Sequence, residues 1–309
     1  MTSSTLQAPR SKTSLWIQAI RPFAFSASVI PVLVGLTSAL LFFPGNINWL
    51  LLPVVLIAAV LFHTGGNLIS EYFDYYYAVD REETLGGSRI LVDGLLTPKQ
   101  ILNAGILTFA VGFLLGLILV YVRGLDILWL GLFGLIAGVF YTMKPFKFKY
   151  IALGDVLIFL AFGPVLVLGS YFALTGDINW NPVWLSIPIG FLVVGILHAN
   201  NTRDIKFDKE ANIKTFAGLI GINGAKIEYY FLVVGAYIST GVLIATGFVG
   251  WYAALVLLSL PVAIKNMKSF SKASLDNPQE IAMLDVMTAQ LHMQFGLLYI
   301  VGILLTALL

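Results

Sequence analysis

The chain contains no cysteine, and only 11% of its 309 residues are charged. The absence of cysteine excludes a disulfide scaffold, a thiol nucleophile and a thiolate metal site. Charged residues make up about 25% of an average soluble domain, whereas 59% of this chain is hydrophobic. A net charge of only +2 also gives no basic excess for binding a nucleic acid. These deficits indicate an integral membrane protein with no nucleic-acid partner.

The hydrophobic residues form runs of about 20 residues, which is the length that an α-helix needs to cross a bilayer. Runs of this length favour helices over the shorter strands of a β-barrel. We therefore expect an all-α integral membrane protein with nine transmembrane helices around a central cavity. The predicted spans are 22–43, 49–72, 101–122, 125–142, 152–174, 182–199, 226–246, 248–265 and 287–309. Residues 1–14 are predicted to be a cytoplasmic tail before an uncleaved first span.

The positions of the basic residues predict the orientation. Of the 18 Lys and Arg residues, all except Arg123 fall on the side of the membrane that holds the N-terminus. By the positive-inside rule that side is the cytoplasm, and the C-terminus lies outside. The loops after the second and sixth spans are the long ones on this side, and they carry most of the acidic residues. We expect a multi-pass protein of the cytoplasmic membrane whose function lies at its cytoplasmic face.

The sixth span runs into the sequence HANNTRDIKFDKEANIKTFAGLIG, residues 198–221. Asn200, Asp204 and Asp208 are successive i, i+4 neighbours and would share one helical face. Two carboxylates on a rigid turn suit Mg²⁺, which is usually held by one or two carboxylates together with water and substrate phosphates. The alternative is a solvated helix end.

A similar cluster ends the second span. Asn67, either Ser70 or Glu71, and Asp74 would fall on one helical face, and Asp80 follows where the helix bends or ends. An ionisable group at membrane depth costs roughly 2.5–3.5 kcal/mol on insertion scales, so several together indicate a site.

The two clusters lie four spans apart, which resembles a duplicated four-helix unit. We expect a single transmembrane domain over 15–309, with halves of about 15–142 and 152–265 and a last helix at 287–309. If the halves face each other across a cavity, their acids would repel unless divalent cations neutralised them. The cavity would then seat a diphosphate, with charge-assisted hydrogen bonds from Arg89, Arg203 and Lys214.

A diphosphate site that opens into an apolar chamber implies a lipid diphosphate. Mg²⁺ would draw off the charge of the leaving group, and aromatic faces would shield the allylic cation. The aromatic candidates are Tyr72, Phe73, Tyr75, Tyr76, Tyr77 and Tyr141. The alternative for the tyrosine run is an anchoring belt at the membrane interface.

At these residues the chain resembles the UbiA superfamily of intramembrane aromatic prenyltransferases. NNTRDIKFDKEANIKTFAGLIG is similar to the second Asp-rich motif of the 1,4-dihydroxy-2-naphthoate prenyltransferases, and YTMKPFKFKYIALGDVLIFLAFGP (141–164) is similar to another segment of that subfamily. The resemblance implies nine spans, a prenyl diphosphate bound through Mg²⁺, and Asp204 and Asp208 as metal ligands. It also makes Arg203 and Lys214 diphosphate contacts. In the first motif Ser70 and Glu71 replace the expected Asn and Asp.

The predicted reaction is Mg²⁺-dependent transfer of a polyprenyl group from its diphosphate to an aromatic acceptor. The acceptor closest to the resemblance is 1,4-dihydroxy-2-naphthoate, in menaquinone or phylloquinone synthesis. The predicted catalytic and metal-binding residues are Asp74, Asp80, Asp204 and Asp208, with Asn67 and Glu71 as further metal candidates. The predicted substrate-binding residues are Asn67, Glu71, Arg89, Tyr141, Lys144, Asn200, Asn201, Arg203 and Lys214.

Two other functions fit the same pattern. A related prenyltransferase could take 4-hydroxybenzoate, homogentisate or a glycerol-phosphate lipid. A cation-coupled transporter would need acids near the bilayer midplane and access from both sides, whereas these acids gather at one face, which counts against a transporter. Outside the two clusters, His63 and His198 could support the neighbouring amides. His292 could form a hydrogen bond to a neighbouring helix. Asp155 could pair with nearby lysines or shape the acceptor pocket.

Overall fold

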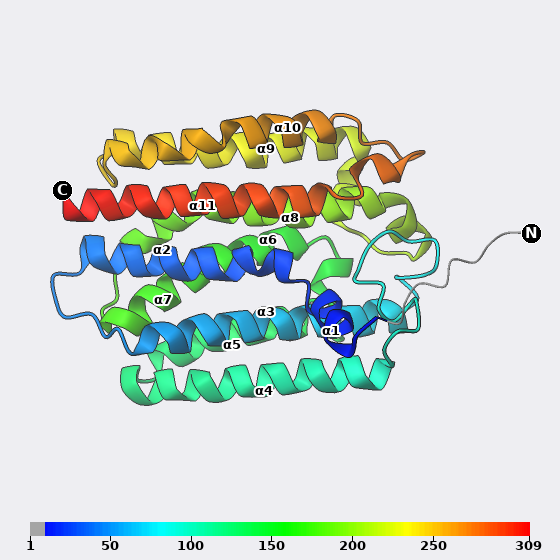
Figure 1. Ribbon diagram of the computed structural model, residues 1–309, viewed down its shortest axis with the longest axis horizontal. Coiled ribbons are helices and arrows are strands. Elements are labelled where there is room, and N and C mark those ends of the chain that lie inside the picture. The colour runs from blue at the N-terminus through cyan, green and yellow to red at the C-terminus, as the bar shows by residue number, and fades with distance from the viewer. Residues whose placement is uncertain (1–9) are drawn as a thin grey trace, which may run out of the picture.

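The computed structural model describes residues 10–309, and helices dominate this part of the chain. In it, eight helices are long and apolar enough to cross a membrane, and a further apolar helix is shorter. The helices lie side by side along the long axis of the molecule, with the C-terminus at one end and α1 at the other (Figure 1). The all-helical membrane architecture predicted from the sequence is therefore confirmed. Residues 1–9 of the predicted tail lie outside the described residues.

Each predicted span corresponds to a helix or to a helix with a short irregular turn. In chain order the elements are α1 (Lys12–Ile20), η1 (Pro22–Phe25), α2 (Ser26–Phe42), α3 (Leu51–Tyr76), α4 (Pro98–Arg123), α5 (Asp126–Val139), η2 (Phe148–Tyr150), α6 (Gly154–Leu160), η3 (Ala161–Val165), α7 (Leu166–Thr175), α8 (Asn181–Glu210), α9 (Phe216–Ala245), η4 (Trp251–Ser259), α10 (Leu260–Phe270), η5 (Pro278–Ile281) and α11 (Leu284–Leu308).

The boundaries differ most where hydropathy is a poor guide. α8 continues to Glu210, past the predicted end at residue 199, because the second acidic motif is itself helical. α5 has only 14 residues, which at 1.5 Å per residue gives about 21 Å, less than the ~30 Å hydrocarbon core. The predicted span 152–174 is interrupted by a π-helical turn at η3, which contains Pro164.

Two side-chain caps fix the loops that carry the acidic motifs. Thr97 and Gln100 form a reciprocal capping box at the start of α4, which ends the loop after α3. Thr215 accepts a hydrogen bond from the backbone N–H of Gly218 at the start of α9, and so ends the loop after α8. α9 bends at Gly221, whose φ of 67° is a left-handed conformation that favours glycine.

The largest buried cluster joins α2, α8, α9, α10 and α11. Tyr229 and Phe270 stack with ring centroids 4.1 Å apart, and the Tyr229 hydroxyl lies 2.7 Å from Thr288 Oγ1. α2 approaches α7 closely at Gly35, where an added Cβ would lie 2.6 Å from Ser170 Cβ. Small residues at such crossings let membrane helices pack backbone against backbone.

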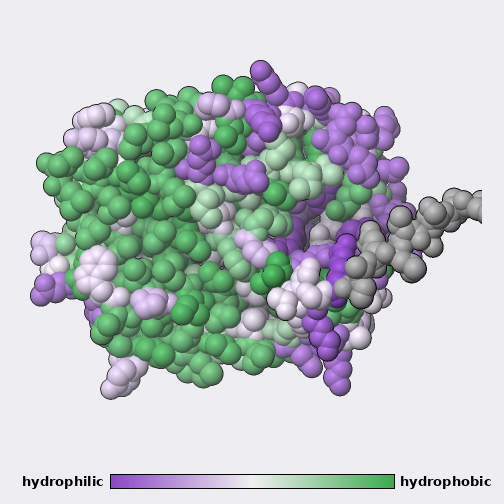
Figure 2. Space-filling model, in the orientation of Figure 1, coloured by the Kyte–Doolittle hydropathy of each residue, from purple (hydrophilic) through white to green (hydrophobic). Residues whose placement is uncertain are grey.

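Polar and apolar surfaces are separated along the long axis. Hydrophobic residues cover most of one end and the middle, and hydrophilic residues gather at the end that contains α1 (Figure 2). We call this the polar end; it holds α1, the loop 77–97 and the loop 211–215 (Figure 1). A multi-pass membrane protein with this distribution presents both acidic motifs at one membrane boundary.

Candidate active site

A cavity of about 350 Å³ lies inside the helical bundle, and both acidic clusters line it. α3 supplies Asn67, Ser70, Glu71 and Asp74, and the loop after it supplies Asp80. α8 supplies Asn200, Asn201, Asp204 and Asp208. The helical periodicity that the sequence predicts for each cluster therefore turns both sets of side chains toward the same space.

On the α3 side, a tight turn places a second acid beside the first. α3 ends at Tyr76, and Ala78 takes a left-handed φ of 54°. The backbone N–H groups of Val79 and Asp80 then donate to the Asp74 carbonyl oxygen, at 2.8 and 3.1 Å. Burial, and next the charge of the Asp74 carboxylate, raise the pKa of Asp80 to about 7. Crowding of this kind is what a bound divalent cation relieves.

On the α8 side, Arg203 holds one of the two acids. Its Nε and Nη2 donate to the two carboxylate oxygens of Asp204, at 2.9 and 2.8 Å. Asp208 is buried one turn later, and its Oδ2 has no hydrogen-bond partner among the described residues. A buried carboxylate oxygen without a donor is an open ligand position.

The dipeptide Gly86–Gly87 passes between the two clusters. A Cβ on Gly86 would lie 2.6 Å from Asp204 Oδ2. One on Gly87 would lie 2.6 Å from Asp80 Oδ2 and 3.3 Å from Glu71 Oε2. Because consecutive Cα atoms are only about 3.8 Å apart, this dipeptide brings acids of both motifs against one short piece of backbone. Gly87 also has a φ of 69°, so a side chain there would be strained as well as crowded.

A lysine from a third segment completes the charged part of the cavity. Lys149 Nζ lies 2.8 Å from Asp74 Oδ2, and the Tyr150 hydroxyl donates to Asp74 Oδ1. Burial alone would lower the pKa of Lys149, but Asp74 and Asp208 raise it well above the usual value for lysine. Lys149 therefore stays charged and offsets part of the acidic charge.

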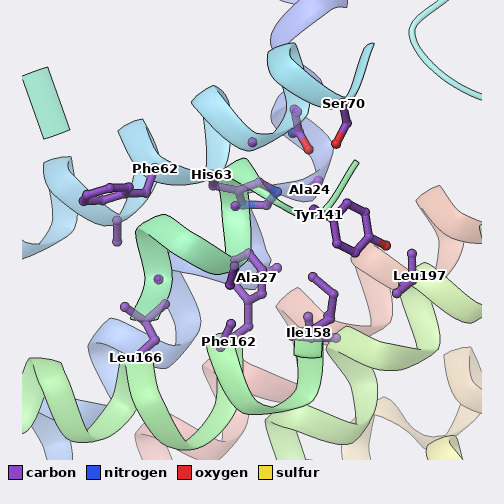
Figure 3. Close-up of a pocket in the computed structure, with 18 of the residues that line it drawn as sticks. Ala24, Ala27, Phe62, His63, Ser70, Tyr141, Ile158, Phe162, Leu166 and Leu197 are labelled. Carbon is purple, nitrogen blue, oxygen red and sulfur yellow. The ribbon is translucent and has the colours of Figure 1, made fainter. Parts of the chain in front are cut away.

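Away from the acids the cavity is apolar and aromatic. Figure 3 shows His63 of α3, Phe162 of η3, Ile158 of α6 and Tyr141 around the same space. The His63 and Phe162 rings meet edge to face at 5.1 Å, and His63 Nδ1 lies 2.8 Å from Ser28 Oγ. The buried Tyr141 hydroxyl has no partner within the described chain.

One face of α5 opens a further apolar extension of the cavity. Its lining residues Leu128, Gly131, Gly134 and Gly138 recur at intervals of three and four and so share that face. A Cβ at Gly131 or Gly134 would meet no other atom within 4 Å, so these glycines border open space.

Comparison with known proteins places the chain in a family. The sequence profile of the UbiA prenyltransferase family matches residues 28–289, which is most of the chain. The chain belongs to the UbiA prenyltransferase family. It is therefore a membrane prenyltransferase, and its all-helical fold is the fold of that family.

Relatives of known name share about a third of the sequence. The UbiA prenyltransferase domain-containing protein 1 of Danio rerio is 33% identical over 300 residues, which cover 96% of this chain and 85% of the relative. The Homo sapiens protein of the same name has the same identity and coverage. The homologue from Drosophila melanogaster is 32% identical over 94% of this chain and 79% of its own length. These names specify the family and no acceptor, so they do not support the finer assignment to the dihydroxynaphthoate subfamily.

Solved structures of UbiA proteins have the same fold at low sequence identity. A UbiA homologue from Aeropyrum pernix K1 matches with a TM-score of 0.65 at 18% identity, over 91% of this chain and 98% of its own. A homologue from Archaeoglobus fulgidus, bound to GPP and Mg²⁺, matches with a TM-score of 0.61 at 15% identity, over 92% and 99%.

In this UbiA protein most of the sequence-predicted site residues line the cavity. They are Asn67, Glu71, Asp74, Asp80, Tyr141, Asn200, Asn201, Asp204 and Asp208. Glu71 accepts a hydrogen bond from the Ser88 N–H at 2.8 Å, which joins it to the loop. The replacement of the expected Asp by Glu at this position therefore keeps a carboxylate at the cavity.

The predicted cationic contacts are placed differently. Arg89 donates to the Thr84 carbonyl at 2.6 Å and pairs with Asp93 at 2.9 Å, which holds it on its own loop. Lys144 and Lys214 are exposed and do not line the cavity. The backbone N–H of Lys214 donates to the Tyr150 carbonyl at 3.2 Å, so this residue positions the Lys149 segment instead.

Arg203 is buried but already engaged by protein groups. Besides Asp204 it donates to Asn200 and to Asp285 Oδ2, the latter at 3.3 Å. These hydrogen bonds indicate that Arg203 positions Asp204 and is not free to bind diphosphate.

Four polar residues were not assigned to the site from the sequence: Lys149, Tyr150, Arg21 and Asp285. Arg21 lines the cavity between α1 and η1 and lies 3.8 Å from Asp285. In the sequence, Arg21 and Lys149 look like topology-setting charges beside spans. One signal in the sequence could have identified Lys149. It lies beside the aromatic Tyr150, inside the segment 141–164 that resembles the family.

Proposed function

We propose that the protein transfers a polyprenyl group from its diphosphate to an aromatic ring, with Mg²⁺ as cofactor and 1,4-dihydroxy-2-naphthoate as acceptor. The observation that carries the proposal is one cavity with carboxylates of two motifs at the polar end and an apolar extension beyond them. A substrate with a polyanionic head and a long apolar tail matches both parts.

The acidic end fits a divalent cation. Asp74, Asp80, Asp204 and Asp208 supply the oxygen ligands that Mg²⁺ prefers, and Asp208 Oδ2 is an open ligand position. When bound, Mg²⁺ would supply positive charge to the departing diphosphate.

Lys149 is the residue of this chain best placed to contact that diphosphate. It is held at the cavity by Asp74 and Tyr150, and it stays charged. A rotation of the flexible lysine side chain would transfer its charge from the Asp74 carboxylate to a phosphate oxygen. Arg203 keeps Asp204 oriented while this happens.

Tyr141, His63 and Phe162 then surround the reacting carbon. These rings would exclude water, and a ring face turned toward the allylic group would stabilise its developing positive charge. Arg21, paired with Asp285 only at 3.8 Å, is available to attract the carboxylate of an aromatic acid. The prenyl cation would bond to the ring carbon that bears the carboxylate, and loss of CO2 would return the electrons of the broken C–C bond to the ring and complete the substitution.

The proposed placement is a cytoplasmic membrane with the polar end in the cytoplasm. The basic residues of loop 77–97, loop 140–153 and loop 211–215 gather at that end, as the positive-inside rule requires of cytoplasmic loops.

Product analysis by mass spectrometry tests the proposal directly. The purified protein is incubated with Mg²⁺, a series of prenyl diphosphates and a panel of acceptors. The panel holds 1,4-dihydroxy-2-naphthoate, 4-hydroxybenzoate, homogentisate and a glycerol-phosphate lipid. A prenylated, decarboxylated naphthalene product is expected. If product forms with only one of the other acceptors, that compound is the acceptor and the proposed one is wrong. If no acceptor gives diphosphate release, the proposed reaction is wrong.

A further inference from the structure

A second charged cluster lies outside the cavity just described. Asp155 of α6, His198 of α8 and Glu228 of α9 point toward one another, with one ligand atom from each lying within 4.8 Å of the other two. His198 Nδ1 lies 3.1 Å from Glu228 Oε2 and 3.5 Å from Asp155 Oδ2. None of the three lines the cavity of the acidic motifs.

The hydrogen bonding of His198 fixes which ring nitrogen carries the proton. The ring is completely buried, and its Nε2 lies 2.8 Å from the carbonyl oxygen of Ala225. A carbonyl only accepts, so Nε2 is the N–H donor and Nδ1 is left to face the two carboxylates. Within residues 10–309, His198 Nδ1, Asp155 Oδ2 and Glu228 Oε2 all lack hydrogen-bond partners.

Three electron-rich atoms that face one another in the protein interior need a positive charge between them. In the described chain no lysine or arginine forms an ion pair with Asp155 or Glu228. The His198 ring stacks on the apolar ring of Phe270, with the two ring centroids 6.1 Å apart. A proton on Nδ1 would set one positive charge against two carboxylates, that of Asp155, which is buried, and that of Glu228, whose side chain is 16% exposed. A divalent cation with a neutral imidazole balances both.

We propose that Asp155, His198 and Glu228 bind one divalent transition-metal cation of the zinc class. Ligand atoms about 2.0–2.2 Å from a common metal lie roughly 3.0–3.5 Å apart at octahedral to tetrahedral angles, and the two observed spacings from Nδ1 are 3.1 and 3.5 Å. Imidazole favours zinc and its neighbours over Mg²⁺, which separates this site from the carboxylate-only cluster.

The surroundings of the three ligands match those of metal ligands. A ligating histidine usually donates its other N–H to a carbonyl, as His198 does to Ala225. Asp155 Oδ1 accepts from the Asn201 amide at 3.4 Å, and Asn201 also lines the cavity. A cation here joins α6, α8 and α9 behind the second acidic motif and fixes the side of α8 that carries Asn201. The site does not depend on which prenyl acceptor is used.

Metal analysis of the purified protein in detergent tests the site. The protein is equilibrated with ZnCl2, washed with Mg²⁺ buffer, and its zinc is measured by inductively coupled plasma mass spectrometry. One zinc per chain is expected in the wild type and in Asp74→Asn, which alters only the acidic cavity. Glu228→Gln and His198→Asn should lose it, and added zinc should raise Tm in the wild type but not in Glu228→Gln.

Wild-type protein without zinc would overturn the proposal, and so would zinc retained in Glu228→Gln. A lower zinc content in Asp74→Asn, with zinc retained in the other two variants, would place the metal in the acidic cavity and would also overturn the proposal. If the variants do not fold, X-ray absorption at the zinc edge of the wild type decides. A shell with one imidazole and carboxylate oxygens supports the site, and an all-oxygen shell refutes it.

Discussion

Individual residues in the cavity act as pairs of opposite charge, one pair for each acidic motif. Lys149 pairs with Asp74 on the α3 side, and Arg203 pairs with Asp204 on the α8 side. Removing one partner of a buried pair typically costs about 3–5 kcal/mol, because the other charge is left alone. Substitutions in these pairs can destabilise the protein, so their effects on activity must be measured separately from their effects on folding.

The metal hypothesis predicts loss of activity in Asp204→Asn and Asp208→Asn. Turnover should fall by more than about 100-fold, because even the outer-shell partners of a metal ligand are worth about 10–100-fold. Diphosphate release measures the turnover. The matched control is Asp93→Asn, which changes a half-exposed acid that forms an ion pair with Arg89 outside the cavity. Near wild-type rates in both cavity variants would exclude these carboxylates as metal ligands.

Substitutions of Lys149 and Lys214 are expected to differ in their effect on the KM for the prenyl diphosphate donor. A hydrogen bond to a charged group is worth about 1.5–3 kcal/mol, so Lys149→Met should raise the donor KM by about 10-fold or more. Lys214→Met should leave it within about twofold, because that side chain is exposed and away from the cavity. Steady-state kinetics with varied prenyl diphosphate measures both. The reverse pattern would restore the assignment that the family motif implies for Lys214.

Asp80 predicts a pH dependence of Mg²⁺ binding. Its raised pKa of about 7 means that the cation-free carboxyl still holds a proton below that pH. Mg²⁺ must displace this proton, so the apparent affinity should rise about 10-fold from pH 6 to pH 8. Isothermal titration of Mg²⁺ at the two pH values measures it. Asp80→Asn should bind more weakly and show a smaller pH effect; an undiminished effect would assign the proton to another group.

At the scale of elements, the helical positions of the two motifs followed from spacing alone. Asn200, Asp204 and Asp208 share a face because α8 stays helical to Glu210, as the i, i+4 spacing predicts. The loop 140–153 could not be inferred in the same way. Its contacts, such as Lys149 with Asp74, join residues 75 positions apart in the chain. Local periodicity carries no information about them.

The glycines of α5 predict a limit on donor length. Gly134→Leu would fill the apolar extension of the cavity without meeting backbone, since a Cβ there has open space. The mean chain length of the preferred prenyl diphosphate should fall. Stability should be kept, because leucine is a better helix former than glycine, which lies about 0.8–1 kcal/mol below alanine. Competition between short and long donors, read by mass spectrometry, tests this. Gly241→Leu on α9, also open but away from the cavity, is the matched control. An unchanged preference would place the prenyl chain elsewhere.

At the scale of the whole molecule, the bundle brings two motifs that are about 130 residues apart to one end. Among the described residues, the helices long enough to cross a membrane correspond to predicted spans, and α5 corresponds to a further predicted span with a shorter helix. The predicted division into two four-helix halves stays a prediction, as does the membrane in which the protein lies. Orientation is the property of the whole molecule that is most easily tested.

The absence of cysteine makes the topology test clean. Ser11→Cys lies at the polar end and Leu309→Cys at the opposite end (Figure 1). In intact cells an impermeant maleimide should label Leu309→Cys only, and permeabilisation should expose Ser11→Cys as well. Labelling of Ser11→Cys alone in intact cells would invert the proposed orientation.

The sequence by itself determined the membrane class, the helical spans, the family motifs and which face of each helix carries the acids. These are local properties, set by hydropathy and by a period of 3.6 residues. Only the tertiary structure decided which cation meets which acid. Lys149 reaches the cavity while Arg89, Lys144 and Lys214 do not, and Asp155, His198 and Glu228 meet from three helices. Such pairings depend on how helices pack side by side, and residue spacing within one helix does not encode that.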